Sequence, residues 1–140
     1  MKILALDVGD QWIGTALSDA IGLLAKPYKT VKPKELHQFL ADLFTQEAIS
    51  TIVIGYPITM RATESNQTQS TVKTKEELEK TFPTITWILW DERLSSKRAQ
   101  TLKKAVTKEE KIKSHSIAAA FILESYLTYL HIQKGTNDDN

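Results

Sequence analysis

Two acidic residues, far apart in the sequence, are the side chains best suited to metal-assisted chemistry. Asp7 follows the apolar run at residues 3–6, and an ionised carboxylate in an apolar strand is costly unless it is paired or binds a metal. Glu92 stands just past the apolar and aromatic segment at residues 84–90. Open α/β sheets carry their sites at the carboxyl ends of strands. The two acids could therefore converge on a hard cation such as Mg²⁺, which prefers oxygen ligands.

Each acid also has a simpler interpretation. If the strand ended at Leu6, Asp7 would begin a solvated turn, and the local pattern leaves both possibilities open. Glu92 could be a turn acid with Arg93 as its surface partner. Neighbouring residues of an extended segment point in opposite directions, so only one of Asp91 and Glu92 would face a site. As a pair, Asp7 and Glu92 favour an ion that orients a water nucleophile and neutralises a scissile phosphate.

The elements that must position these acids follow from the periodicity of apolar residues. A hairpin is indicated first, then a strand whose Pro27 favours a sheet edge, and then alternating helices and strands. Ser114 is the expected N-cap of the last helix, which a mobile loop would precede. The expected strands lie at residues 2–8, 13–19, 25–31, 50–57 and 84–90, and the expected helices at residues 33–44, 67–80, 95–105 and 115–133, with the loop at residues 106–114.

This order predicts one α/β domain over residues 1–133, followed by a disordered C-terminal tail at residues 134–140. Strands joined through helices imply parallel pairing with right-handed crossovers, and the leading hairpin adds antiparallel neighbours. We therefore expect a mixed five-stranded sheet, with antiparallel strands first and parallel strands later, and helices on both faces.

Composition narrows the functional classes. The chain has 140 residues, a formal net charge of +1 and no cysteine. A strong overall field toward nucleic acid or membrane is absent, and disulfides, thiolate zinc sites and a cysteine nucleophile are excluded. Asp7 interrupts the first apolar run, so a signal peptide is not expected, and neither is a membrane span. A cytoplasmic protein without a membrane partner is the expectation.

Four segments in the same order resemble the YqgF family of RNase H-like nucleases, also called Holliday junction resolvases. They read ALDVGDQWIGTALSD, VIGYPITM, DERLSS and SHSIAAAFILESYL, and together they span nearly the whole chain. The resemblance implies an RNase H-like fold and a phosphodiesterase that depends on Mg²⁺ or Mn²⁺. Bacterial members are associated with trimming the 5′ end of precursor 16S rRNA, and the family was first described for branched DNA. The implied partner is nucleic acid, with precursor rRNA favoured over branched DNA.

By this resemblance, Asp7 and Glu92 match two of the family's three metal-binding acids. The third acid opens the last helix, and His115 stands at that position. An imidazole ligates a metal as a neutral group, so the site would lose one negative charge. Mg²⁺ would then bind less well, and Mn²⁺ would suffer less. His115 could equally have no ligand role, and Asp19 and Glu124 are other acids that could in principle substitute.

Further departures from the family concern substrate contacts. Trp12 replaces a residue that is usually basic, and it could stack on a base of a single strand or cover neighbouring surface. Arg61 lies in a loop that has lost the family's glycines, and it could still contact a phosphate, as could Arg93 of the DERL segment. A basic run could bind the nucleic-acid backbone, although such runs are usually solvated faces: Lys97, Arg98, Lys103, Lys104, Lys108, Lys111 and Lys113.

The leading hypothesis is an endonuclease in which Asp7, Glu92 and His115 hold the metal. Two alternatives remain open. The chain could bind nucleic acid with impaired catalysis because of His115, or it could be a nucleotide-binding module that shares the leading hairpin of the sugar kinases. A monomer or a weak homodimer is expected.

Overall fold

The computed structural model describes residues 1–9, 11–56, 66–91 and 107–138 of the chain. A five-stranded sheet with the order β3-β2-β1-β4-β5 lies at its centre. β1 pairs antiparallel with β2, β2 antiparallel with β3, and β4 and β5 run parallel to β1. The expected mixed sheet is therefore confirmed. The strands are β1 (Lys2–Val8), β2 (Ile13–Ser18), β3 (Ala25–Val31), β4 (Ile49–Tyr56) and β5 (Thr86–Asp91).

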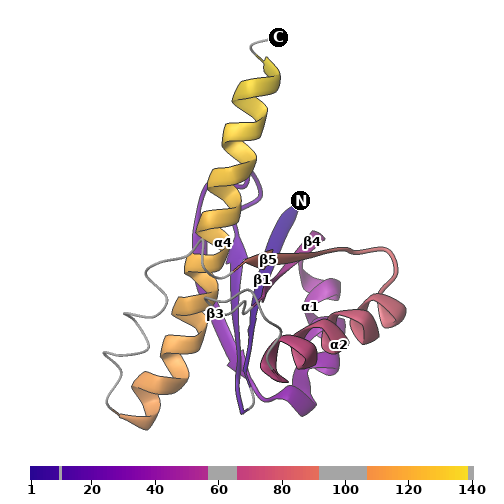
Figure 1. Ribbon diagram of the computed structural model, residues 1–140, viewed down its shortest axis with the longest axis vertical. Coiled ribbons are helices and arrows are strands. Elements are labelled where there is room, and N and C mark those ends of the chain that lie inside the picture. The colour runs from indigo at the N-terminus through magenta and orange to yellow at the C-terminus, as the bar shows by residue number, and fades with distance from the viewer. Residues whose placement is uncertain (10, 57–65, 92–106, 139–140) are drawn as a thin grey trace.

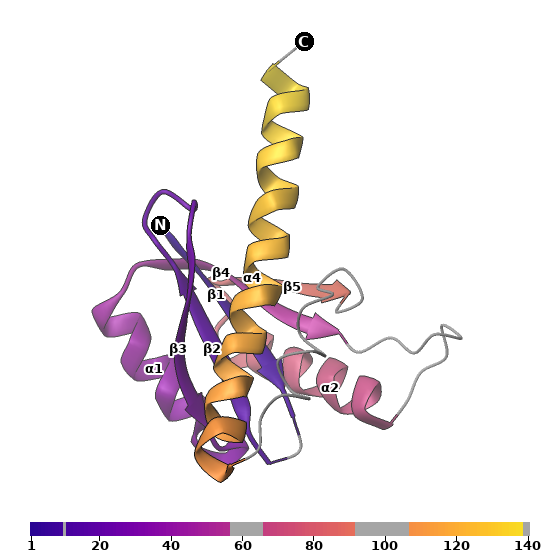
Figure 2. The same cartoon turned by 90° about the vertical axis from the view of Figure 1, so that its left-hand side faces the viewer.

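Helices cover both faces of this sheet, as expected. The short 3-10 turn η1 and helix α1 follow β3, α2 lies between β4 and β5, and α4 is the last element. Figure 1 shows α1 and α2 on one face and α4 crossing the other, with its C-terminal turns projecting beyond the strands; Figure 2 shows the same arrangement from the side. The bounds are η1 (Pro33–Glu35), α1 (Leu36–Gln46), α2 (Asn66–Thr81) and α4 (Lys108–Asp138).

Alternation along β1 explains why the two faces differ. Leu4, Leu6 and Val8 are buried in a cluster with residues of α1 and α2. Ala5 belongs to a second cluster with Ala16 and residues of α4. Side chains of a strand alternate between the two faces, so large residues pack toward α1 and α2 and small ones toward α4. The small side chains let α4 lie close to the sheet.

The start of α4 corrects the sequence-based expectation. The helix begins at Lys108, and residues 107–114 are its cap and first turns rather than a mobile loop. The N–H of Glu110 donates to Thr107 Oγ1 over 3.1 Å, and the N–H of Thr107 donates to Glu110 Oε2 over 3.3 Å. This reciprocal pair is a capping box, which fixes a helix N-terminus. Ser114 is not an N-cap: it is buried inside the helix, and its Oγ donates to the Lys111 carbonyl over 2.6 Å.

The other predicted elements agree with the structure where it describes them. The helix expected at residues 95–105 lies outside the described residues. α4 continues to Asp138, so the stretch expected as a polar tail begins as helix. No helix in the described part of the chain is long and apolar enough to cross a membrane.

Candidate functional site

Asp7 lies inside β1, and only 1% of it is exposed. The solvated-turn interpretation of this residue is therefore wrong. Ala5, two residues earlier, packs toward α4, so alternation places the Asp7 side chain on the same face. Its Oδ2 atom is buried and accepts no hydrogen bond from the described residues, although Asp7 does interact with other groups of the protein. A carboxylate is thus buried at the carboxyl end of β1, on the face that α4 covers.

Gly14 brings the main chain of α4 close to Asp7. The two residues are direct cross-strand partners in the β1–β2 ladder. A Cβ atom at position 14 would stand 1.9 Å from the His115 carbonyl oxygen and 2.8 Å from the Ser116 nitrogen. Glycine is therefore required because the helix backbone occupies the space of a side chain. This contact places the backbone of His115 beside the strand position opposite Asp7.

Side-chain hydroxyl groups donate hydrogen bonds to the α4 carbonyls at residues 111–113, in the turn before His115. Thr30, the β3 partner of Gly14, donates from Oγ1 to the Ile112 carbonyl over 2.8 Å. Ser116, which is buried, donates to the Lys113 carbonyl over 2.9 Å. Together with the Ser114 bond described above, three consecutive helix carbonyls each receive a side-chain hydroxyl. Such bonds to helix carbonyls often bend a helix. Here they support the turn that faces Gly14.

Two of the three predicted metal ligands lie among the described residues. The backbone of His115 lies against Gly14, the cross-strand partner of Asp7, whereas Glu92 and Arg93 lie outside the described residues, directly after the end of β5 at Asp91. Within the described ranges, no group of three or more His, Cys, Asp and Glu side chains is arranged to hold a metal. The other predicted contact residues outside the described part are Arg61, Lys97, Arg98, Lys103 and Lys104.

Neither alternative acid is near Asp7. Asp19 follows the far end of β2, five residues beyond Gly14, and strands rise about 3.3 Å per residue. Glu124 is exposed and lies nine residues beyond His115 on α4, where each residue adds about 1.5 Å. His115 is itself half-buried and lies about two turns inside the helix, not at its N-terminus as expected.

Trp12 closes the hairpin next to this site. The N–H of Gly9 donates to the Trp12 carbonyl over 3.0 Å, and the Trp12 side chain is half-buried. The Nζ atom of Lys32 lies 5.9 Å from the centroid of the Trp12 ring, a distance at which a cation is attracted to an aromatic face. The sequence did not reveal Lys32 as a neighbour of Trp12, because twenty residues separate the two.

Exposed lysines surround this end of the molecule. Figures 1 and 2 show the first turns of α4 at the same end as the carboxyl end of β1. Lys108, Lys111 and Lys113 lie on those turns and are exposed, as are Lys29 and Lys32. The ion pairs among described residues are Lys2–Glu47 and Lys75–Glu79, so none of the five lysines is neutralised there by a described acid.

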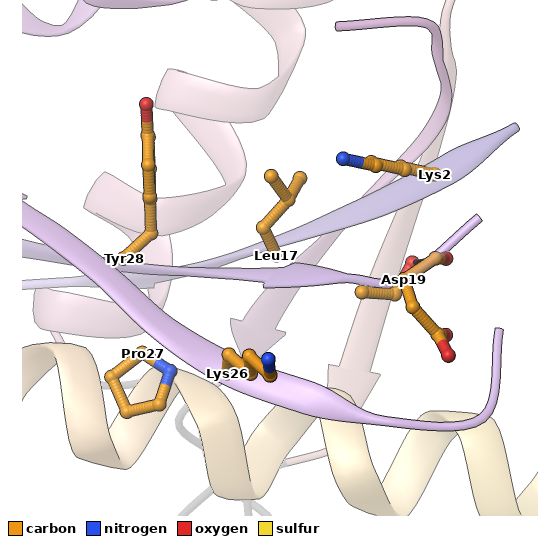
Figure 3. Close-up of a pocket in the computed structure, with 7 residues that line it drawn as sticks. Lys2, Leu17, Asp19, Lys26, Pro27 and Tyr28 are labelled. Atoms are coloured by element: carbon orange, nitrogen blue, oxygen red, sulfur yellow. Dashed lines mark hydrogen bonds between the residues drawn. The ribbon is translucent and has the colours of Figure 1, made fainter.

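A cavity of about 310 Å³ opens at the opposite end of the strands. Figure 3 shows Leu17 and Tyr28 projecting from the same side of the strands into this region. Hydrogen bonds from the N–H groups of Leu23, at 2.7 Å, and Leu24, at 3.2 Å, reach Asp19 Oδ1. Desolvation alone would raise the pKa of Asp19, but bonds from Leu24, Leu23 and Gly22 lower it below its ordinary value. The lining residues are Lys2, Leu17, Ser18, Asp19, Lys26, Pro27 and Tyr28.

Residues 1–129 match the protein family described as "RuvX: Holliday junction resolvase". A protein of Desulfitobacterium hafniense named "Putative pre-16S rRNA nuclease" is 38% identical over 144 residues, covering 99% of this chain and 100% of the relative. A Staphylococcus aureus protein of the same name is 35% identical over 138 residues, covering 93% of this chain and 97% of the relative.

Two solved structures share the fold. The RuvC protein of T. thermophilus in complex with a Holliday junction substrate aligns with a TM-score of 0.63 and 15% identity, covering 94% of this chain and 96% of RuvC. The Fowlpox virus resolvase with Holliday junction DNA aligns with a TM-score of 0.50 and 12% identity, covering 93% of this chain and 99% of the resolvase. At such identities the likeness concerns the fold, and it agrees with the expected RNase H-like architecture.

Proposed function

The chain belongs to the RuvX family, also called YqgF, and we propose that it is a metal-dependent endonuclease that processes the 5′ end of precursor 16S rRNA. One observation carries the proposal: a buried carboxylate, Asp7, ends β1 on the face where Gly14 admits the backbone of α4 at His115. This arrangement joins an acid of the first strand to the last helix, as the family resemblance of the sequence implies.

The donor atoms of the three proposed ligands suit a divalent cation. Asp7 would supply a buried carboxylate oxygen, Glu92 a second carboxylate, and His115 an imidazole. Trp90 and Ile88 of β5 pack in the same cluster as residues of α4, and Glu92 follows the end of this strand in the sequence. Two acids and one imidazole suit Mn²⁺ better than Mg²⁺, which prefers oxygen ligands only. A bound ion would activate water and offset the charge of the scissile phosphate.

The remaining residues would bind and orient the substrate. The exposed lysines around the start of α4 and the end of β3 suit the phosphate backbone of nucleic acid, and each neutralised phosphate makes binding more sensitive to salt. Arg93, Arg61, Lys97 and Arg98 are proposed to extend this surface on the basis of sequence alone. A precursor rRNA substrate would place the protein in the cytoplasm.

RNA is favoured as the substrate by the names of the full-length relatives. Branched DNA is the second candidate, because the family description and the RuvC complex both refer to Holliday junctions. A third possibility is binding without cleavage. It rests on His115, which replaces an acid and removes one negative charge from the proposed site.

Cleavage assays would separate these candidates. A labelled precursor 16S rRNA 5′ leader and a four-way DNA junction are incubated with the protein and either Mg²⁺ or Mn²⁺, with Asp7→Asn as the inactive control. We expect cleavage of the leader, faster with Mn²⁺, that Asp7→Asn abolishes. Cleavage of the junction alone would reassign the substrate to branched DNA. Binding of the leader without cleavage in either metal would overturn the nuclease proposal.

A further inference from the structure

The Trp12–Lys32 pair depends on an irregularity in the sheet. Between Gly14 and Ala16 the β2–β3 register shifts by one residue, so that Gly14 pairs with Thr30 and Ile13 with Val31. Continuing this register places Lys32 opposite Trp12. Without the shift, Val31 would take that place, and the aromatic ring would have an apolar neighbour instead of a cation. Bulges often redirect side chains near active sites.

Thr15 stabilises this bulge. Its side chain is fully buried, and Oγ1 donates to the Lys29 carbonyl over 2.6 Å and accepts from the Lys29 N–H over 2.9 Å. A single hydroxyl therefore satisfies both backbone groups of the residue that the bulge leaves outside the regular ladder. The position of Lys32 beside the ring is thus built into the fold of the edge strand.

The backbone of Lys32 is fixed, whereas its ammonium group is available. The Lys32 N–H donates to Glu35 Oε1 over 3.0 Å, and the Glu35 N–H donates to the Lys32 carbonyl over 2.9 Å. The Lys32 side chain is exposed and makes no ion pair with a described residue. An anchored main chain, with a cation above an aromatic ring and no ion pair to a described acid, suits a ligand that is both planar and anionic.

The Trp12–Lys32 pair lies close to Asp7 along the β1–β2 hairpin. Ile13, the first residue of β2, is buried in the cluster toward α1, so alternation extended by one residue would turn Trp12 to the opposite face, which Asp7 and α4 share. Trp12 precedes Gly14 by two residues, a rise of about 6.6 Å along the strand, and Gly14 is the direct partner of Asp7. A nucleotide next to a phosphate held at Asp7 would therefore reach the ring.

We propose that Trp12 and Lys32 form a binding site for an unpaired nucleotide next to the scissile phosphate. The base stacks on the indole ring, and Lys32 contacts the adjoining phosphate. A base inside a duplex cannot expose its face in this way, so the site selects substrates that are single-stranded beside the cut. This inference rests on the proposed nuclease function, and it specifies the class of substrate.

Binding to RNA without catalysis tests the site. Fluorescence anisotropy measures the affinity of each protein for a labelled, unstructured 12-nucleotide RNA and for the duplex of the same RNA, in buffer with EDTA. Removing one base-stacking aromatic side chain weakens single-strand binding about 5- to 150-fold, and we expect a loss in this range for Trp12→Leu. Duplex binding should stay within twofold of the wild type. Trp12→Phe should retain most of the single-strand affinity.

Lysine variants test the phosphate contact. Lys32→Gln should lower the slope of log affinity against log salt by about one, because one phosphate contact is lost. Lys26→Gln, an exposed lysine at the opposite end of β3, is the matched control and should leave the slope unchanged.

Two outcomes would overturn the proposed site. One is wild-type affinity of Trp12→Leu for the single strand, and the other is an equal loss for single strand and duplex. Trp12→Phe keeps the ring, so equal weakness of the Phe and Leu variants would also contradict stacking. EDTA prevents cleavage, so these results do not depend on the nuclease proposal. Conversely, a nuclease whose single-strand affinity is unaffected by Trp12→Leu would contradict only the nucleotide site.

Discussion

The polar and charged side chains at the two ends of the strands differ in their bonding partners. At the end that holds the cavity, Ser18 Oγ accepts from the Ile3 N–H over 2.8 Å and donates to the Asp19 carbonyl over 2.9 Å. Lys2 pairs with Glu47 at 2.8 Å. At the other end Asp7 is buried beside the backbone of α4, and the nearby Lys32 and Lys111 are exposed without an ion pair to a described acid.

The two ends differ in where their charged groups find partners, so they are expected to differ in role. Two of the cavity's charged residues, Lys2 and Asp19, form an ion pair and hydrogen bonds within the protein, so they stabilise a strand end and a turn. The end with Asp7 combines a buried carboxylate with exposed lysines that form no ion pair with a described acid. We therefore propose the carboxyl end of β1 as the functional end, and the following substitutions compare the two ends.

Alanine substitutions of Gly14 and Gly22 should give the largest difference in stability and cleavage between the two ends. In Gly14→Ala the new Cβ would lie 1.9 Å from a backbone oxygen, so α4 must shift away from β2. Overpacking of this kind costs about 1–3 kcal/mol and occasionally more, and we expect the upper end together with loss of cleavage. Gly22→Ala is the control, because its nearest neighbour, Leu127, is 3.9 Å away, although φ is +73°. Left-handed backbone costs an alanine about 1–2 kcal/mol.

Urea denaturation and the cleavage assay measure both variants. Gly22→Ala should retain cleavage, because the β2–β3 turn lies at the opposite end. Full activity of Gly14→Ala would show that the close approach of α4 is not needed for the site.

An acid at position 115 should shift the metal preference. His115→Asp would restore a negative charge beside Asp7, and we expect Mg²⁺ affinity to rise about tenfold, the lower end of the changes seen around metal sites. His131→Asp is the control at the other end, where Nε2 of His131 lies 3.0 Å from the Gly22 carbonyl oxygen. Cleavage rates titrated against Mg²⁺ measure the effect. An unchanged Mg²⁺ dependence in His115→Asp would remove residue 115 from the ligand set.

The smallest expected effect is the contribution of Asp19, at the cavity end, to the pH dependence of stability. Backbone N–H bonds lower the pKa of Asp19 in the folded protein, although desolvation acts in the opposite direction. Its stabilising contribution is therefore present above the pKa of the unfolded chain, about 3.9, and is lost as pH falls through the lower folded value. The difference in melting temperature between wild type and Asp19→Asn should shrink below about pH 4. A difference that grows on acidification would contradict this assignment.

Regular patterns in the sequence predicted most of the fold. Alternation and β-branched residues located all five strands, and Pro27 correctly marked an edge strand. The start of α4 was missed, although Thr107 and Glu110 have the spacing of a capping box. The turn that follows, at residues 108–111, is highly charged and has no apolar periodicity, so the pattern indicated a loop although lysine and glutamate are good helix formers.

The site could be predicted only in part. The sequence predicted Asp7 and His115 as ligands, but it did not indicate the importance of Gly14, because the role of this glycine depends on how closely α4 packs against β2. The Trp12–Lys32 contact requires a one-residue register shift held by Thr15, and no local pattern encodes that shift. Contacts between elements distant in the sequence could therefore not be predicted. Residues with distinctive chemistry could be named as candidates from the sequence.

The central claim is that Asp7, and not the acid at the cavity end, supports catalysis. Cleavage of the precursor 16S rRNA leader with Mn²⁺ is measured for wild type, Asp7→Asn and Asp19→Asn, with thermal unfolding to confirm that each variant folds. The account predicts that Asp7→Asn falls to background while Asp19→Asn keeps the wild-type rate. A folded Asp7→Asn protein that cleaves at the wild-type rate would contradict it.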